Sequence, residues 1–383
     1  MDNPFKNIKI AGGSGTHTVL SVLAGEHSIG GGILQFFDMK KANDLRLVCP
    51  EFKEAVSNFP WMDDKSQIRG NIEKWRAIFR YARVVNVSDR PDDLVDADFV
   101  HIRGGARTRL HTVNMKVDWT KVSKVTDAAF VYLRGIHTLN ITCCKLVTDA
   151  AFVHLRGIHT LDMTYCDQVT ITDAAFVHLR GIHTLEMWDC TQITDAAFSN
   201  LRGIHTLNIG HCRQITDAAF VNFRGIHSLN MGEGNPETVS DAAFVHLRGI
   251  HTLNMNECRQ ATNAAFSNLC GIHTLSMAGC TQVTDATFVH LRGIHTLTMS
   301  RCGQEAITDA AFVHLRGIYN LNMEGCDQTT ITAAGIKQLR GIHSLDTYFC
   351  SPAVKAAAKK ILTLSQAWSL GLPKANPGTE VYY

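Results

Sequence analysis

One short pattern of apolar and polar residues recurs through most of this chain. In its fullest form it reads Leu-Arg-Gly-Ile-His-Thr-Leu-Asn-Met-x-x-Cys, and successive good copies are 22 or 24 residues apart. Weaker copies start at Ala82 and Leu110, which gives about twelve units over residues 82–350. The two extra residues of the longer copies follow the cysteine, which indicates a loop on one face of an unchanged unit. The good copies are anchored on Ile136, Ile158, Ile182, Ile204, Ile226, Ile250, Ile272, Ile294, Ile318 and Ile342.

Each copy predicts one strand followed by one helix. After Ile182, the apolar residues Leu185 and Met187 lie two positions apart, as in a strand with one buried face. Residues 194–203 then carry a helical apolar stripe, with Thr194 as the expected N-cap and Gly203 as the expected left-handed stop. Such a unit cannot bury its apolar faces alone, but stacked copies can. We therefore expect an α/β solenoid.

Nine of the 12 cysteines recur at the last position of the pattern. This spacing predicts a buried ladder of small side chains and neither a disulfide framework nor a CxxC metal site. A reduced, intracellular setting, cytoplasmic and/or nuclear, fits best. The same thiol repeated so often also argues against a unique catalytic nucleophile. The nine are Cys144, Cys166, Cys190, Cys212, Cys258, Cys280, Cys302, Cys326 and Cys350.

Histidine, arginine and aspartate form three further ladders. Histidines such as His183 follow the isoleucine, and a straight row of them suits strand-edge hydrogen bonding better than tetrahedral zinc. Arginines such as Arg202 end the helices and aspartates such as Asp195 begin them, which is the arrangement that helix dipoles favour. Because the two signs balance to a formal net charge of +2, we expect no nucleic-acid partner, and the apolar runs are too short to span a membrane.

The frame Ile-x-x-Leu-x-Met-x-x-Cys resembles the strand of leucine-rich repeats. Its cysteine, followed by Thr-Asp-Ala-Ala-Phe, resembles the cysteine-containing subclass, and the resemblance covers residues 82–350. Asp118 and Gly234 depart from it where cysteine is expected. The resemblance implies a horseshoe, with a parallel sheet on the concave face and helices on the convex face.

The positions that do not repeat are the candidates for binding. On the expected concave face they are the residue before the methionine and the two residues after it, and in the last unit they include Tyr348 and Phe349. Tyr165 and Trp188 stand in neighbouring units among acidic residues, a composition typical of interface hot spots for a basic partner. The substrate-binding candidates are Asp162, Tyr165, Glu186, Trp188, Asp189, His211, Glu233, Glu257 and Arg301.

Residues 1–61 carry no repeat and show helical period in the short runs 17–23, 32–37 and 44–56. The second and third runs, followed by Trp61, resemble an F-box, although its usual opening Leu-Pro-x-Glu is missing. The resemblance implies docking on a Skp-type adaptor of a cullin ubiquitin ligase, and a plain helical cap is the alternative. The adaptor-binding candidates are Ile33, Leu34, Phe37, Leu45, Leu47 and Val48.

Residues 62–81 are expected to form a connector and N-terminal cap, and residues 351–383 a capping helix and a loose tail. We find no GxSxG, P-loop, HExxH, paired CxxC or dinucleotide motif, so we expect neither an enzyme nor a cofactor. Two functions remain open. One is the substrate-recognition subunit of a Skp-cullin-F-box ubiquitin ligase, which holds an unknown protein on the concave face. The other is a free-standing leucine-rich repeat scaffold that binds proteins without a ligase.

Overall fold

The computed structural model describes residues 38–47, 50–90, 93–103, 110–233 and 238–369, without the side chains of Leu45, Glu51 and 364–369. The chain forms two compact units, residues 1–158 (unit one) and 159–383 (unit two).

In the part of unit one that the structure describes, three helices precede three parallel strands, which follow in chain order. Val85, Val113 and Leu139 occupy equivalent places in the register. Its elements are α3 Met39–Leu45, α4 Pro50–Asn58, α5 Ile72–Ile78, β1 Val84–Asn86, η1 Asp96–Asp98, α6 Phe99–Ile102, β2 Thr112–Asn114, η2 Asp127–Leu133, β3 Thr138–Asn140, α7 Asp149–Phe152 and η3 Val153–Leu155.

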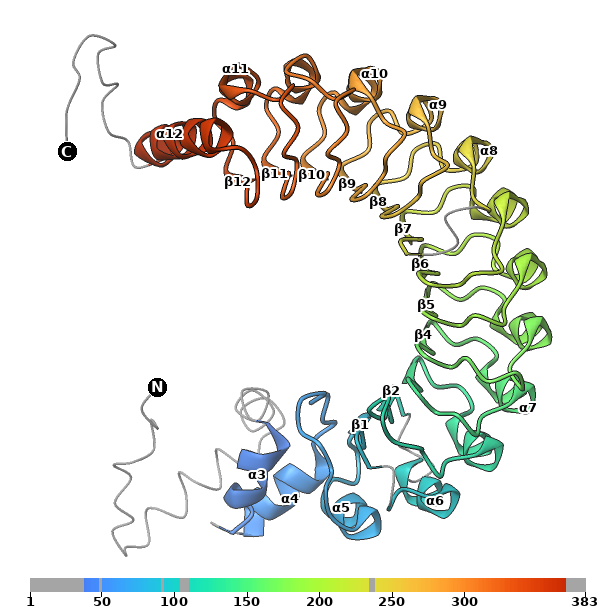
Figure 1. Cartoon of the computed structure of the whole chain (residues 1–383). Helices are drawn as coiled ribbons and strands as arrows, with labels where there is room; N and C mark the ends of the chain where they lie inside the picture. The colour runs from blue at the N-terminus through green and yellow to red at the C-terminus, as the bar shows by residue number, and fades with distance from the viewer. Residues whose placement is uncertain (1–37, 48–49, 91–92, 104–109, 234–237, 370–383) are drawn as a thin grey trace, which may run out of the picture. The chain divides into compact units, whose positions relative to one another are not determined.

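Unit two is a solenoid of nine parallel strands in chain order. The strands line the inner side of an arc and the short helices lie outside it (Figure 1). Its strands are β4 Thr160–Asp162, β5 Thr184–Glu186, β6 Thr206–Asn208, β7 Ser228–Asn230, β8 Thr252–Asn254, β9 Thr274–Ser276, β10 Thr296–Thr298, β11 Asn320–Asn322 and β12 Ser344–Asp346. Its helices are η4 Asp173–Leu179, η5 Asp195–Asn200, η6 Asp217–Phe223, α8 Asp241–Phe244, α9 Asn263–Phe266, α10 Asp285–Phe288, η7 Val289–Leu291, η8 Ala311–Leu315, α11 Ala333–Ile336, η9 Lys337–Leu339 and α12 Pro352–Ser369.

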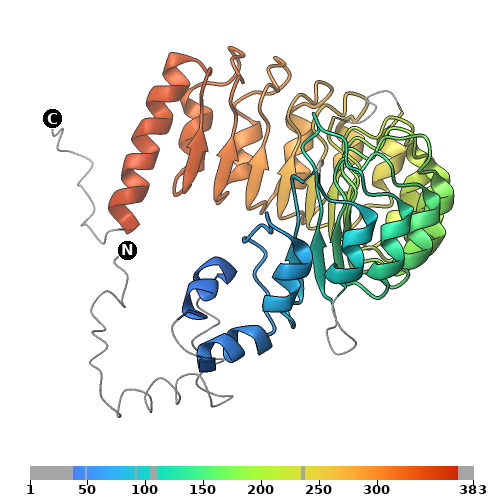
Figure 2. The same ribbon diagram turned by 90° about the horizontal axis from the view of Figure 1, so that it is seen from below.

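The core runs along the solenoid as columns of equivalent residues. Ile182, Leu185 and Met187 are at most 2% exposed. The corresponding residues of the next repeat are at most 3% exposed. Phenylalanines such as Phe198 form a second buried column under the helices. The predicted parallel solenoid with strands inside and helices outside is therefore confirmed. At the far end of unit two, α12 packs against β12 and α11 (Figure 2).

The predicted repeat helix is shorter and tighter than its pattern suggested. Residues 194–203 were expected to be helical, but η5 covers only Asp195–Asn200 and is a 3₁₀ helix. A 3₁₀ helix rises about 2.0 Å per residue against 1.5 Å in an α-helix, so a few residues cross the outer side of the repeat. Thr194 is the N-cap, because its hydroxyl accepts from the Ala196 amide, and Gly203 has a φ of +83°. The predicted N-cap is confirmed. Gly203 has the predicted left-handed backbone, but the helix already ends at Asn200, with Leu201 as its C-cap.

The aspartate that opens each helix binds the next repeat. The Thr216 amide donates to Asp195 Oδ1 at 2.8 Å, and the Thr216 hydroxyl donates to Asp195 Oδ2 at 2.6 Å. Equivalent pairs recur in both units, and Asn263 replaces the aspartate beside Thr284. The interpretation of these aspartates as helix-dipole partners was therefore incomplete. Each carboxylate also links two repeats, because it accepts hydrogen bonds from the N-cap residue of the following helix.

The cysteine ladder is buried and hydrogen-bonded. The Cys212 thiol donates to the Met187 carbonyl of the preceding repeat at 3.1 Å. Six further ladder thiols make the equivalent contact, namely those of Cys144, Cys190, Cys280, Cys302, Cys326 and Cys350. Burial raises the pKa of the Cys212 thiol to about 12 and that of the Cys302 thiol to about 11. Cys270 differs, because it is exposed and stands where other repeats carry arginine.

Iodoacetamide is therefore expected to label Cys270 alone among the eleven described cysteines when the native protein is treated at pH 8. The ladder thiols stay protonated at that pH because their raised pKa values lie above it, and burial blocks the reagent. Peptide mass spectrometry before and after denaturation measures the labelling. Rapid native labelling of Cys212 or Cys302 would contradict the buried ladder.

The histidine ladder is a stack of rings along the sheet. The His183 and His205 ring centroids are 4.4 Å apart with nearly parallel planes, and the stack continues to His343 with Tyr319 inserted. In eight of these histidines Nδ1 lies about 3 Å from the hydroxyl of the threonine that follows, as in His205 and Thr206. Partial burial and the neighbouring imidazoles lower the pKa of His205. The histidine ladder was predicted to form hydrogen bonds with its neighbours, and its rings contact the neighbouring hydroxyl groups in this way.

Unit one shows what its first helices cover. The helical run expected over 44–56 is interrupted, because α3 ends at Leu45 and α4 starts at Pro50, a residue suited to the first turn of a helix. Trp61 is buried against Phe79, and its indole donates to the Val56 carbonyl at 2.8 Å. The Trp61 carbonyl accepts from the Arg83 amide next to β1. The helices thus close the open end of the sheet. The predicted runs 17–23 and 32–37 lie outside the described residues.

Candidate functional site

Six of the predicted binding residues gather on three neighbouring repeats of unit two. Asp162 ends β4, Glu186 ends β5, and the two residues are paired in the parallel register. Trp188 and Asp189 follow β5, Tyr165 follows β4 and His211 follows β6. We call Asp162, Tyr165, Glu186, Trp188, Asp189 and His211 the aromatic–acidic cluster.

Three rings form the centre of this cluster. The Tyr165 and Trp188 ring centroids are 4.8 Å apart in an edge-to-face arrangement. Trp188 and His211 stack at 4.9 Å, and His211 Nδ1 lies 2.8 Å from Asp189 Oδ1. The indole occupies this place because residue 210 is glycine: a Cβ there would lie 2.5 Å from Trp188 Cδ1. Ring contacts and the polar contact between His211 and Asp189 hold these side chains in one arrangement before any partner binds.

The carboxylates of the cluster repel one another. Adjacent parallel strands lie about 4.8 Å apart, so the paired register brings Asp162 and Glu186 close together. Burial raises the pKa of Glu186, and the charge of Asp162 raises it further, although a hydrogen bond with Asn208 opposes both effects. The site therefore has a surplus of negative charge that a cation would relieve.

The structure corrects where several of these residues lie. They were expected on the strand, but each strand has three residues, and the residue before the cysteine lies in the following turn with a left-handed backbone. Gly279 and Gly325 occupy this position in two repeats, with φ of 69° and 70°. In the others a side chain is kept at a conformational cost of about 1 kcal/mol. These residues are Cys143, Tyr165, Asp189, His211, Glu233, Glu257, Arg301 and Phe349.

Three predicted residues stay apart from the cluster. Glu257 pairs with Arg259 at 2.9 Å. Glu233 and Arg301 are exposed turn residues on other repeats. They lie along the same row as Tyr165 and Asp189 without contacting the aromatic rings, so they can extend a binding surface but do not build its centre.

A second aromatic pair lies in the last repeat and is not among the predicted binding residues. Tyr348 and Phe349 are 61% and 62% exposed, and their ring centroids are 4.1 Å apart. Both were recognised as irregular positions, but the acidic surroundings of Trp188 favoured the middle of the array. The signal in the sequence that could have identified this pair is that two aromatic residues stand next to each other at positions that do not repeat.

The adaptor-binding candidates are only partly described. Ile33, Leu34, Phe37 and Val48 lie outside the described residues, and the side chain of Leu45 is not described. Leu47 follows α3 and is 87% exposed.

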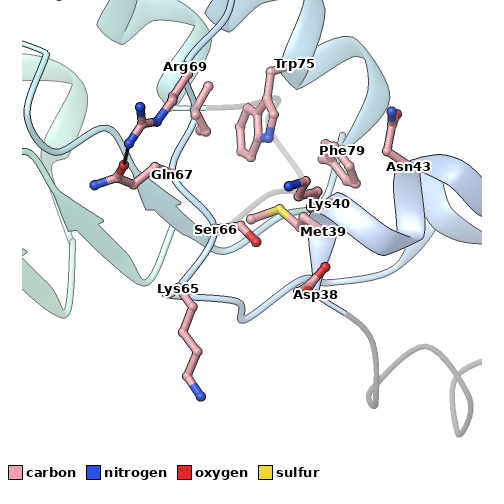
Figure 3. A pocket seen from close by; sticks show the side chains of 11 residues that line it. Asp38, Met39, Lys40, Asn43, Lys65, Ser66, Gln67, Arg69, Trp75 and Phe79 are labelled. Atoms are coloured by element: carbon pink, nitrogen blue, oxygen red, sulfur yellow. Dashed lines mark hydrogen bonds between the residues drawn. The ribbon is translucent and has the colours of Figure 1, made fainter. Parts of the chain in front are cut away.

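A cavity of about 600 Å³ lies beside α3 and α5 in unit one. Met39, Trp75 and Phe79 give it an apolar wall, and Lys40 and Lys65 lie at its border (Figure 3). It opens next to Asp38, where the described part of the chain begins.

The arrangement around Trp188 can bind but shows no means of covalent chemistry. His211 and Asp189 form a pair that could carry a proton, but the nearby Cys190 and Cys212 thiols are buried with raised pKa values. Among the described residues, no group of three or more histidine, cysteine, aspartate or glutamate side chains could hold a metal ion. None of the helices that the structure describes has the length and apolar content needed to cross a membrane.

Several solved structures are similar to this chain at low sequence identity. A chain of the Drosophila Toll–Spatzle complex matches 72% of this chain and 42% of its own length, with a TM-score of 0.51 and 12% identity. A chain of the yeast Rad7–Elc1 complex is 13% identical and matches 83% of this chain and 89% of its own length, with a TM-score of 0.42. A chain of the mouse RP105/MD-1 complex is 14% identical and matches 76% of this chain and 56% of its own length, with a TM-score of 0.46. This chain thus spans less than half of the Toll-complex chain.

No curated protein matches this sequence. The model of the BspA type leucine rich repeat region, which has six copies of the repeat, matches residues 107–227 and 213–333. These residues make up more than half of the chain and exclude the N-terminal segment, so the F-box likeness rests on the sequence resemblance alone. The columns of buried residues and the parallel strands agree with the match, and the chain belongs to the BspA-type leucine-rich repeat family.

Proposed function

We propose that this chain is a non-catalytic protein-binding scaffold, and that the aromatic–acidic cluster binds a basic segment of a protein partner. The observation that carries the proposal is the contact of Tyr165, Trp188 and His211 in one column beside three carboxylates. The buried columns of the solenoid consist of residues that repeat, but this column is assembled from residues that do not repeat.

The charges favour a lysine or arginine side chain as the central contact. Asp162, Glu186 and Asp189 outnumber the single histidine, and burial together with the charge of Asp162 raises the pKa of Glu186 despite its hydrogen bond with Asn208. A partner cation beside Glu186 would lower that pKa again and gain the corresponding electrostatic energy. The methylene stem of the same side chain can pack on the indole while its charged end reaches the carboxylates.

The backbone supports a binding role for the turn residues. Glycine is the least strained residue at a left-handed position, and Gly279 and Gly325 show that the fold accepts it there. Tyr165, Asp189 and His211 nevertheless keep their side chains at this position. Strained residues of this kind gather at functional sites when their side chains are needed.

A peptide-display selection on the full chain tests the proposal. We expect the selected peptides to be enriched in lysine and arginine spaced around an aromatic or long aliphatic residue. Their binding should fall in the Asp162→Asn/Glu186→Gln variant, which removes two charges without changing size. Selection of acidic or purely apolar peptides, or equal binding by this variant, would refute the assignment.

The Skp-type adaptor is a second candidate partner, supported by the F-box resemblance and by Leu47. A leucine with 87% of its surface exposed next to a small helical packet is suited to docking on another protein. As a ligase subunit the chain would supply proximity: it would hold its protein substrate near the ubiquitin carrier.

Leu47→Asp is expected to abolish capture of the chain by an immobilised Skp adaptor, because an ionised side chain cannot be buried in an apolar interface. The matched control is Lys53→Asp, which places the same residue at an exposed position of α4. Melting curves establish that both variants fold. If the native chain is not captured, the free-standing scaffold is the correct alternative.

A further inference from the structure

In unit two, one stretch of each repeat lacks acidic residues, and most of these stretches carry an arginine. Binding at the aromatic–acidic cluster does not involve these arginines. In each repeat, the twelve residues from the helix to the buried leucine of the next strand contain no aspartate or glutamate. This holds for 174–185, 196–207, 218–229, 242–253, 264–275, 286–297, 310–321 and 334–345. The same stretches carry Arg180, Arg202, Arg224, Arg248, Arg292, Arg316 and Arg340. We call these seven residues the arginine edge.

Contacts between repeats hold the arginine edge in a line. Arg202 Nε donates to Asn222 Oδ1 at 3.2 Å, and Arg224 Nε donates to His246 Nδ1 at 3.3 Å. In each case the acceptor lies two residues before the arginine position of the next repeat. One guanidinium therefore follows another along the solenoid, except between Arg248 and Arg292, where Cys270 replaces the arginine. Arg180, Arg248, Arg292 and Arg316 make the same contact. These arginine side chains are exposed. In five of the six contacts only Nε donates to the acceptor, which leaves the terminal NH₂ groups available for a ligand. Arg316 also donates from Nη2 to Gln338 Oε1 at 2.6 Å.

The histidine stack runs beside the arginine edge. Arg224 and His227 are separated only by Gly225 and Ile226, and the glycine faces open space. His205 and His227 stack at 4.6 Å, and His227 and His251 stack at the same distance. The interior rings therefore cover one another's faces, and this surface offers no open aromatic face on which a nucleic-acid base could stack.

The acidic groups of the repeats are engaged elsewhere. The helix-opening aspartates accept two hydrogen bonds each from the next repeat, as Asp217 does from Ser240. Within the part of the chain that the structure describes, no ion pair links an arginine of the edge to a carboxylate. A row of guanidinium groups without acidic neighbours attracts anions more strongly than the small net charge of the chain suggests.

We propose that the arginine edge binds a sulfated polysaccharide. Its groups form a line, which suits a linear polymer, and a guanidinium fork matches the oxygens of a sulfate with two parallel hydrogen bonds. A sugar chain needs no base stacking, which the covered imidazole rings could not provide. This surface is separate from the aromatic–acidic cluster, so either site can be correct without the other.

Fluorescence anisotropy of a labelled heparin oligosaccharide with the full chain tests the proposal. Arg224→Gln/Arg248→Gln removes two charges from the arginine edge, and we expect affinity to fall about tenfold. The matched control, Arg213→Gln/Arg259→Gln, removes the same charge from turns that follow the strands and should bind like the native chain. Arg224→Lys/Arg248→Lys should recover part of the affinity, because it keeps the charge without the fork.

Three results would overturn the proposal. The first is no heparin binding by the native chain at low salt. The second is equal loss in the edge variant and its control, which would indicate attraction by total charge. The third is equal or tighter binding of poly(U) RNA or desulfated heparin, which would remove the requirement for sulfate. Matching circular dichroism melting curves are required of every variant, and the peptide-binding assay reports separately on the cluster.

Discussion

Alanine in place of Trp188 is expected to weaken binding of the basic partner about 100-fold, the effect of losing an interface hot spot. The indole contacts Tyr165 on one side and His211 on the other, so its removal separates the column as well as deleting its largest surface. Isothermal titration with a selected peptide measures the change. Stability should change little, because Trp188 is only partly buried.

Two further variants show whether the position of the indole matters. Trp119→Ala removes a tryptophan that is 74% exposed in unit one and should leave affinity unchanged. Gly210→Ala keeps the indole but places a methyl group in its space, so affinity should fall although Trp188 is present. If Trp188→Ala and Trp119→Ala bind the peptide equally well, the cluster is not the binding site.

Phe198→Ala is expected to destabilise unit two by about 3–5 kcal/mol, the usual range for a phenylalanine removed from a core. Phe198 is fully buried, and its ring lies 5.2 Å from Phe223 and 6.4 Å from Phe176. The cavity would therefore interrupt the phenylalanine column in the middle of the solenoid. Urea unfolding followed by circular dichroism measures the loss.

Hydrogen exchange can locate this loss within the array. Each repeat contacts its neighbours alone, so protection should decrease first in the repeats that contain Phe176, Phe198 and Phe220. The matched control is Val221→Ala, which shortens a side chain that is 46% exposed on η6, and should change stability by less than about 0.5 kcal/mol. Similar unfolding of the two variants would contradict a continuous buried column.

The strand pattern was predictable because it is local and repeated. The positions of Ile182, Leu185 and Met187 within one copy already show which face is buried, and stacking of copies adds only the partner that covers it. Thr194 and Gly203 were predictable for the same reason, since an N-cap and a left-handed stop depend on neighbouring residues. The helix type was not predictable, because the apolar stripe of residues 194–203 is compatible with either an α-helix or a 3₁₀ helix.

The sequence predicted which positions form a row of candidate binding residues, but it did not predict that some of them form a cluster. Irregular positions identified Tyr165, Trp188 and their acidic neighbours, but the sequence does not tell which irregular side chains touch. Gly210 illustrates the difference: its missing side chain admits the indole of the preceding repeat, a relation between residues 22 positions apart in the chain. Glu233, Glu257 and Arg301 share the row without joining the rings.

The sequence by itself determined the repeating unit, its buried face, its caps and the order of its strands, because each depends on residues close together in one copy. The tertiary structure alone decided how copies bind one another. It turned the helix-opening aspartates into links such as that between Asp195 and Thr216, and it bent the backbone at Tyr165 and Asp189 into the left-handed region. It also aligned the arginines into an edge. These features require atoms of different repeats to come within hydrogen-bonding or packing distance, and the register between repeats sets that distance.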